Sequence, residues 1–218
     1  MKKQEKVKKR KTNYFFFDFV KVTGVPFMWL LLRPKLIYEN ERAREKVKGG
    51  ALLIANHSGN IDPIVAMFAL WYRRHHFVAT KELFNNKFKK WLFTRFHCIE
   101  IDRDNVSMDS FKHIITCLKE DKLVSIFPEG RKTNTDEVQD FKAGAALMAI
   151  LSQKPIVPVY LKRRKNIFER QKIIIGETID VAKILNGKPS LTEIENISER
   201  LRERQSQLKF IADGLRKK

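Results

Sequence analysis

Short apolar runs alternate with longer amphipathic segments through most of the chain after residue 50. The short runs predict buried β-strands, and the longer periodic segments predict α-helices. The expected strands are 51–55, 76–80, 98–101, 123–127, 156–160 and 171–176. The expected helices cover about 62–72, 86–95, 107–120, 141–152 and 192–216. This alternation indicates an α/β fold in which helices cover a mostly parallel or mixed central sheet.

Residues 14–32 form the most apolar stretch of the chain. The stretch nearly reaches the roughly 20 residues that a membrane-spanning helix needs. Asp18 and Lys21 interrupt it, and Pro26 is expected to break a single helix. We therefore expect two short helices that lie in the membrane interface, the second of which begins at Pro26.

The net charge of the chain is +19 over 218 residues, which adds information about its partners. Such a charge implies an anionic partner, which can be a nucleic acid, an anionic membrane, an acidic protein or a phosphorylated substrate. Residues 1–12 carry six Lys, one Arg and one Glu, which is typical of a solvated tail or of an arm that binds anionic headgroups. We divide the chain into residues 1–34, a basic arm with a membrane-interfacial helical segment, and residues 35–218, an α/β domain.

The turn after the strand 51–55 holds the clearest candidate chemistry. His57 and Asp62 stand five residues apart there, separated by short polar and flexible residues. A strand-to-helix turn can bring the two side chains within hydrogen-bond reach. A carboxylate on one ring nitrogen fixes the tautomer of the imidazole and leaves the other nitrogen able to accept a proton. The pair therefore predicts a general base that can activate a hydroxyl group.

Polar residues also follow three other expected strands. They are Lys81 and Glu82, then Asp102 and Arg103, and finally the segment 128–131. In open α/β sheets, ligands bind at the carboxyl ends of the strands. We therefore expect all these polar groups to share one edge of the sheet with His57.

These residues resemble the motifs of the glycerolipid acyltransferase family. The first family motif, Asn-His-x4-Asp, matches 56–62, and the second, which ends in Ile-Asp-Arg, matches 101–103. The third, Phe-Pro-Glu-Gly-Thr-Arg, matches 127–130 in its first half, and a following Phe-Lys-x-Gly-Ala matches 141–145. The fourth, a strand similar to Val-Pro-Val, matches 156–159. The motifs occur in the order that the family shows.

The chain departs from the family pattern at two places. His97 stands where the second motif usually opens with glycine, and Arg131 and Lys132 stand where the third usually has Thr-Arg. A guanidinium group binds phosphate through two parallel hydrogen bonds, whereas an ammonium group is a point charge. The departure therefore bears on the headgroup that is bound rather than on the reaction.

The resemblance implies transfer of an acyl group from a thioester to a lipid hydroxyl, with His57 as the base and Asp62 as the residue that orients it. The bacterial type member of the family acylates 1-acylglycerol-3-phosphate, which is lysophosphatidic acid. The donor is then acyl-carrier protein or acyl-coenzyme A, and neither a metal ion nor a resident cofactor is expected. The implied acceptor pocket comprises Arg103, Glu129, Gly130 and Arg131, with Lys81 and Lys132 as further phosphate ligands.

Three alternatives remain open on the sequence. The acceptor can be another lyso-lipid, such as a lysophospholipid or a lyso-ornithine lipid. The basic patch 162–165 and the net charge permit a nucleic-acid-binding protein, although none of the standard nucleic-acid motifs is present and no nucleic-acid partner is expected. The third is a lipid-binding protein without activity. Two cysteines suit a reducing compartment, and we expect peripheral or monotopic attachment to the cytoplasmic face of the cell membrane.

Overall fold

The computed structural model describes residues 13–102, 107–133, 137–181 and 189–214. The centre is a seven-stranded mixed sheet with the order β1-β7-β6-β2-β5-β3-β4. Among the paired strands of the described residues, only β6 and β7 are antiparallel, so β1 and β7 run against the other strands. The strands are β1 (Lys35–Tyr38), β2 (Ala51–Ala55), β3 (His75–Thr80), β4 (Ile99–Ile101), β5 (Leu123–Ile126), β6 (Ile156–Leu161) and β7 (Lys172–Ile175). The predicted fold class, a mixed sheet covered by helices, is confirmed.

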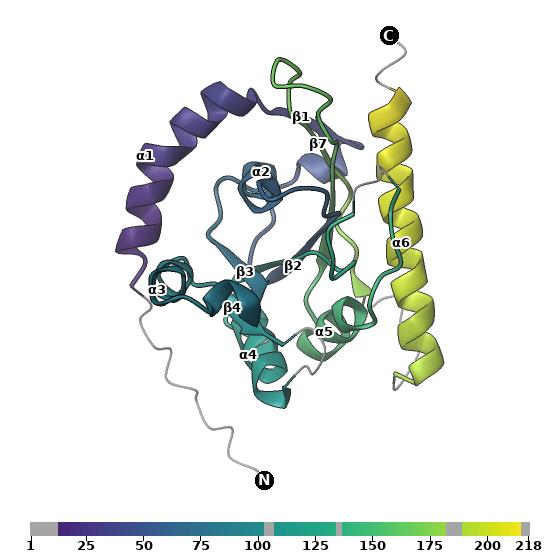
Figure 1. The fold of residues 1–218 in the computed structure, drawn as a ribbon. Helices are drawn as coiled ribbons and strands as arrows, with labels where there is room; N and C mark the ends of the chain where they lie inside the picture. Colours follow the sequence, from purple (N-terminus) through teal and green to yellow (C-terminus); the bar gives the residue numbers. More distant parts are fainter. Residues whose placement is uncertain (1–12, 103–106, 134–136, 182–188, 215–218) are drawn as a thin grey trace.

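Six α-helices lie among the described residues and surround the sheet (Figure 1). They are α1 (Phe15–Leu32), α2 (Asp62–Ala69), α3 (Lys87–Arg95), α4 (Met108–Lys119), α5 (Gly144–Ser152) and α6 (Leu191–Gly214). The described residues also form two 3-10 helices, η1 (Arg42–Arg44) between β1 and β2 and η2 (Lys81–Phe84) between β3 and α3. Every strand and helix expected after residue 50 is present, with ends shifted by a few residues. The structure adds the edge strand β1, which was not among the expected strands.

Alternate residues of β2 face the two layers of helices. Leu52 and Ile54 belong to a buried cluster with side chains of α4, α5 and α6, whereas Leu53 and Ala55 belong to a cluster with α2. All five residues of β2 are buried. A strand covered on both faces must be apolar throughout, which explains the uninterrupted run Ala51–Ala55.

The N-terminal segment corrects one prediction. α1 is a single helix of 18 residues, and Pro26 lies inside it instead of beginning a second helix. Proline removes one hydrogen-bond donor, whereas ending the helix among apolar residues leaves several backbone groups unpaired, each at a cost of several kcal/mol away from water. One turn before the proline, the hydroxyl of Thr23 donates to the carbonyl oxygen of Phe19 at 2.9 Å. α1 is also long and apolar enough to cross a membrane.

Contacts at both ends hold α1 against the rest of the protein. At the N-terminal end, the guanidinium of Arg74 binds both carboxylate oxygens of Asp18, at 2.8 and 2.7 Å. The hydroxyl of Tyr14 lies 2.9 Å from Nε2 of His76 on β3. At the other end, Leu32 is fully buried in the cluster beneath α2. The helix therefore lies along the α/β domain and not away from it (Figure 1).

The strands that lead into the sequence motifs share one edge of the sheet. β2 pairs with β5, β5 with β3, and β3 with β4, and all three pairs are parallel. The carboxyl ends of these four strands therefore meet at one edge, as the sequence predicted. This register places the β2–α2 turn beside the loop that follows β5, although about 70 residues separate them in the chain.

Candidate active site

The turn between β2 and α2 is organised by one carboxylate. Asp62 is the first residue of α2 and is buried. Its Oδ2 atom accepts hydrogen bonds from the backbone N–H groups of Ser58, at 2.6 Å, and Gly59, at 2.7 Å. The same oxygen lies 2.9 Å from Nδ1 of His57. A carboxylate held by backbone donors at a helix N-terminus keeps a fixed position, and so fixes the imidazole.

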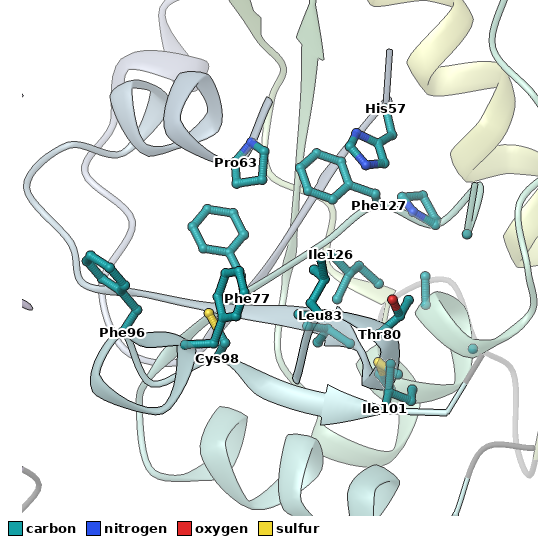
Figure 2. Close-up of a pocket in the computed structure, with 18 of the residues that line it drawn as sticks. His57, Pro63, Phe77, Thr80, Leu83, Phe96, Cys98, Ile101, Ile126 and Phe127 are labelled. Atoms are coloured by element: carbon teal, nitrogen blue, oxygen red, sulfur yellow. The ribbon is translucent and has the colours of Figure 1, made fainter. Parts of the chain in front are cut away.

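His57 lines a large cavity. Its imidazole stacks on Phe127 with the ring centroids 4.4 Å apart and an interplanar angle of 21°. Figure 2 shows this stacked pair, with Pro63 and Phe77 nearby. When Nδ1 carries the proton and donates a hydrogen bond to Asp62, Nε2 has a free lone pair. The geometry therefore presents a proton acceptor at the wall of the cavity.

Glu129 binds the backbone of the turn that holds His57. Its side chain is buried, and Oε2 accepts a hydrogen bond from the backbone N–H of His57 at 3.4 Å. Oε1 is buried without a hydrogen-bond partner among the described residues. Burial raises the pKa of Glu129 to about 7, the His57 N–H lowers it, and the nearby charge of Asp62 raises it. Burial therefore favours the protonated form of this carboxyl group relative to an exposed glutamate.

The loop after β5 is fixed against the same turn by backbone contacts. The N–H of Thr133 donates to the carbonyl oxygen of His57 at 2.9 Å. Within this loop Gly130 has a φ of +70°, and a Cβ added there would lie 3.1 Å from Cε of Lys142. Both the left-handed backbone and the close lysine favour glycine at this position. The glycine of the Pro-Glu-Gly motif therefore has a steric explanation.

The cavity in front of His57 has a volume of about 1420 Å³ and is lined mainly by apolar side chains. One wall comes from side chains of α1. Another comes from β3 with the adjoining η2, of which Figure 2 shows Phe77, Thr80 and Leu83. Side chains of α4 and α5 extend it further. A cavity this large and apolar exceeds what a small polar substrate requires and suits an acyl chain.

The predicted binding residues occupy different places. Gly130 and Lys132 line the cavity together with His57, and Lys132 hydrogen-bonds to the side chain of Asn60 at the catalytic turn. Lys81 instead forms an ion pair with Asp102 at 2.5 Å and is not part of the cavity lining. Arg131 is exposed and also stands outside the lining. Arg103 lies outside the described residues.

Several polar residues of the cavity wall were not singled out from the sequence, and two of them, Asn60 and Lys142, lie beside the predicted site residues. Lys142 lines the cavity and packs over Gly130, and Asn60 binds Lys132. Lys142 belongs to the Phe-Lys-x-Gly-Ala segment, so its type was visible in the sequence. Its closeness to Gly130 follows from the backbone hydrogen bond between its N–H and the carbonyl oxygen of Pro128, at 3.1 Å. No periodic pattern in the sequence indicates such a contact.

The cavity also contains a thiol, that of Cys98. Burial raises the pKa of Cys98 to about 12, so it stays protonated and is a poor nucleophile. Among the described residues, no group of three or more His, Cys, Asp or Glu side chains could hold a metal ion. The group in this cavity that is positioned for proton transfer is the imidazole of His57.

The fold places a histidine, oriented by a carboxylate, at an apolar cavity. This arrangement is suited to acyl transfer, and comparisons with known proteins agree. The Acyltransferase family model matches residues 35–162. The 1-acyl-sn-glycerol-3-phosphate acyltransferase of Bacillus subtilis (strain 168) is 32% identical over 171 residues, which cover 76% of this chain and 84% of that protein. The enzyme of the same name from Streptococcus pneumoniae (strain ATCC BAA-255 / R6) is 28% identical over 192 residues, covering 85% and 70%.

A solved structure shares the fold. The crystal structure of the 1-acyl-sn-glycerophosphate acyltransferase PlsC from Thermotoga maritima matches with a TM-score of 0.61 and 18% identity, over 89% of this chain and 79% of that one. The chain belongs to the acyltransferase family, and it is an acyltransferase.

Proposed function

We propose that this acyltransferase transfers a fatty acyl group from a thioester to lysophosphatidic acid and so makes phosphatidic acid for phospholipid synthesis. The observation that carries the proposal is the oriented imidazole of His57 at the wall of a large apolar cavity that also contains Lys132. The relatives from Bacillus subtilis and Streptococcus pneumoniae are named for this activity. The donor is acyl-carrier protein or acyl-coenzyme A.

The reaction follows from the position of Nε2. The free hydroxyl of the acceptor lies against Nε2 of His57, which takes the hydroxyl proton as the oxygen attacks the thioester carbonyl carbon. Asp62 stabilises the imidazolium ion through Nδ1. The tetrahedral intermediate then collapses, the C–S bond breaks, and the imidazolium returns the proton to the departing thiolate. A positioned base of this kind contributes roughly 10²–10⁴-fold to the rate.

The phosphate of the acceptor is assigned to the lysine side of the cavity. Lys132 and Lys142 lie on the same wall as Gly130, beside His57. Ammonium groups bind phosphate as point charges, so they attract the headgroup without fixing its rotation. The acyl chains then extend into the apolar part of the cavity.

The position of α1 supports attachment to one face of a membrane. The helix is about 27 Å long at 1.5 Å per residue, and contacts to the α/β domain hold both of its ends. A spanning helix would place its two ends on opposite sides of the bilayer. The outward face of α1 exposes large apolar side chains, and the net charge of +19 suits the anionic cytoplasmic leaflet.

A matrix of donors and acceptors tests this function. The purified full chain is given acyl-carrier protein or acyl-coenzyme A as donor, and lysophosphatidic acid, other lysophospholipids or lyso-ornithine lipid as acceptor, with products read by mass spectrometry. We expect phosphatidic acid to form fastest. Equal rates with acceptors that lack a phosphate group would contradict the assigned acceptor.

Membrane attachment has its own test. Membranes that carry the protein are washed with carbonate, and protease is added from each side in turn. The proposal predicts that both flanks of α1 are cleaved from the same side. Cleavage of the two flanks from opposite sides would show that α1 spans the bilayer.

A further inference from the structure

The helix α3 is rich in basic and aromatic residues, and most of them are exposed. Its sequence, Lys-Phe-Lys-Lys-Trp-Leu-Phe-Thr-Arg, contains four basic residues and no acidic residue. None of its side chains is buried. Leu92 and Phe93 are half-buried and face the protein, whereas Phe88 is 67% and Trp91 46% exposed. The helix therefore presents aromatic and basic groups to its surroundings.

Contacts with the protein hold only one part of α3, through Phe93 against Phe84 and Trp91 against Phe16. An isolated helix of nine residues is unstable in water, because helices this short do not recover the cost of nucleation. The side chain of Asn86 caps the first turn by accepting from the N–H of Phe88 at 2.8 Å, which contributes about 1 kcal/mol. Aromatic side chains in water add nothing to this, whereas the same side chains at a lipid headgroup layer bury apolar surface.

Three exposed groups of α3 contact one another on one side of the helix. The rings of Phe88 and Trp91 stack with centroids 6.1 Å apart, and the guanidinium of Arg95 lies 5.9 Å from the centre of the Trp91 ring. Lys89 and Lys90 are exposed as well, but they project from other sides of the helix, because successive residues are about 100° apart. We use the name α3 face for the five exposed side chains Phe88, Lys89, Lys90, Trp91 and Arg95. Its mixture of aromatic rings and cations is typical of surfaces that lie at an anionic membrane interface.

The α3 face is continuous with the apolar outer surface of α1. The ring of Phe16 on α1 packs edge-on against Trp91, at 5.3 Å between centroids, and α3 lies beside the N-terminal end of α1 (Figure 1). The neighbouring residues Phe15 and Phe19 of α1 are 77% and 58% exposed. Two surfaces of this kind in direct contact can meet the same membrane plane.

We propose that the α3 face is a second membrane-binding surface, selective for anionic lipid headgroups, which acts together with α1. This inference rests on the proposed function, because it assumes that the enzyme works at a membrane. α1 supplies apolar insertion that does not depend on headgroup charge, and α3 supplies charge-dependent binding at one end of α1. If α1 alone bound the membrane, the whole protein could still rotate about the axis of α1. A second contact at α3 prevents this rotation and so fixes the orientation of the cavity relative to the lipid.

Vesicle flotation with the purified full chain tests the proposal. The variant Lys89→Gln/Lys90→Gln removes two charges, and its control, Arg200→Glu, makes the same net change of two on the exposed side of α6. With vesicles that contain phosphatidylglycerol, each lysine removed should weaken binding roughly fivefold, and hence both about 25-fold. With phosphatidylcholine vesicles, both variants should bind as the unchanged chain does. Equal binding of the lysine variant and its control to anionic vesicles would overturn the proposal.

A second pair of variants tests the aromatic part of the face. Phe88→Ser removes an exposed ring of α3, and Phe210→Ser removes a ring of α6 that is 80% exposed. Neither ring is buried, so both variants are expected to fold. Phe88→Ser should weaken binding to anionic vesicles several-fold, and Phe210→Ser should leave binding unchanged. Equal loss in both variants would show that general surface hydrophobicity, and not the α3 face, governs binding.

Activity in detergent micelles separates this inference from the proposed function. There, Lys89→Gln/Lys90→Gln should acylate lysophosphatidic acid at the rate of the unchanged chain, because no bilayer has to be bound. If the unchanged chain itself is inactive, the proposed function fails, whatever the vesicles show. If the variant loses rate only with acyl-carrier protein as donor and floats normally, the α3 face binds the acidic carrier protein, and the membrane proposal is wrong.

Discussion

The two sides of His57 are built differently. On one side Asp62 and Glu129 are buried, and backbone N–H groups hold both carboxylates in place. On the other side Arg131 and Lys132 are exposed, and Lys132 contacts the protein through the side chain of Asn60. The side that holds the base is rigid, and the side assigned to the phosphate is open and adjustable.

This difference separates the reaction from its specificity. A base must be held within a few tenths of an ångström of its productive position, and buried hydrogen bonds achieve that. A phosphate can be attracted by a flexible ammonium group in several geometries. We therefore expect substitutions on the buried side to lower the turnover rate or stability, and substitutions on the exposed side to change mainly the apparent affinity for the acceptor.

The largest effect in this comparison is predicted for Asp62→Asn. The amide keeps an oxygen that can accept from the backbone of the turn, but it cannot stabilise the imidazolium form of His57. We expect kcat to fall about 10³-fold while KM for lysophosphatidic acid changes little. Steady-state kinetics and a thermal melt check this. A fall in Tm in proportion to activity would mean that Asp62 only stabilises the turn.

Glu129→Gln tests the buried side through the pH dependence of stability. The pKa of Glu129 is raised by burial to about 7 from the ordinary value of 4.5, so the folded chain binds this proton more tightly than the unfolded chain. The contribution of this proton to the free energy of unfolding is fully present below about pH 4.5 and is lost as the pH rises through 7. Relative to the Gln variant, the unchanged chain should lose at most about 3 kcal/mol between pH 4.5 and 8. Urea unfolding measures this, and a difference that does not vary with pH would contradict it.

Lys132→Ala tests the exposed side. Losing one charged contact to a phosphate costs about 1.5–3 kcal/mol, so KM for lysophosphatidic acid should rise roughly tenfold or more, with kcat nearly unchanged. An acceptor without phosphate serves as the control, because its KM should not change. A fall in kcat with an unchanged KM would place Lys132 in the chemical step instead.

The smallest effect is predicted for Arg131→Ala. This side chain is exposed and does not line the cavity, although the family resemblance suggested a role in the acceptor pocket. We expect KM to change by less than about threefold, as is usual for exposed charges. A change as large as that of Lys132→Ala would show that the loop closes over the acceptor when it binds.

The sequence was most informative where the relevant contacts are local. His57 and Asp62 lie in one turn, so their spacing alone predicted the hydrogen bond between them. The central strands β2, β5 and β6 were visible as apolar runs, because they are buried along their whole length.

Other features depend on contacts between distant residues or on competing energies. Whether Lys81 or Lys132 reaches the cavity depends on ion pairing with Asp102 and on the path of the loop after β5. Pro26 was expected to end a helix, but its cost is smaller than that of leaving backbone groups unpaired in apolar surroundings. Local sequence patterns show neither the contacts between distant residues nor the balance between competing energies.

The central claim is that Nε2 of His57 removes the proton from the lipid hydroxyl. The most direct measurement is the formation of phosphatidic acid from lysophosphatidic acid and an acyl thioester by purified His57→Ala, followed by mass spectrometry beside the unchanged chain. The account predicts a folded protein whose rate is lower by about 10³-fold or more. A folded His57→Ala variant with the unchanged rate would contradict the account.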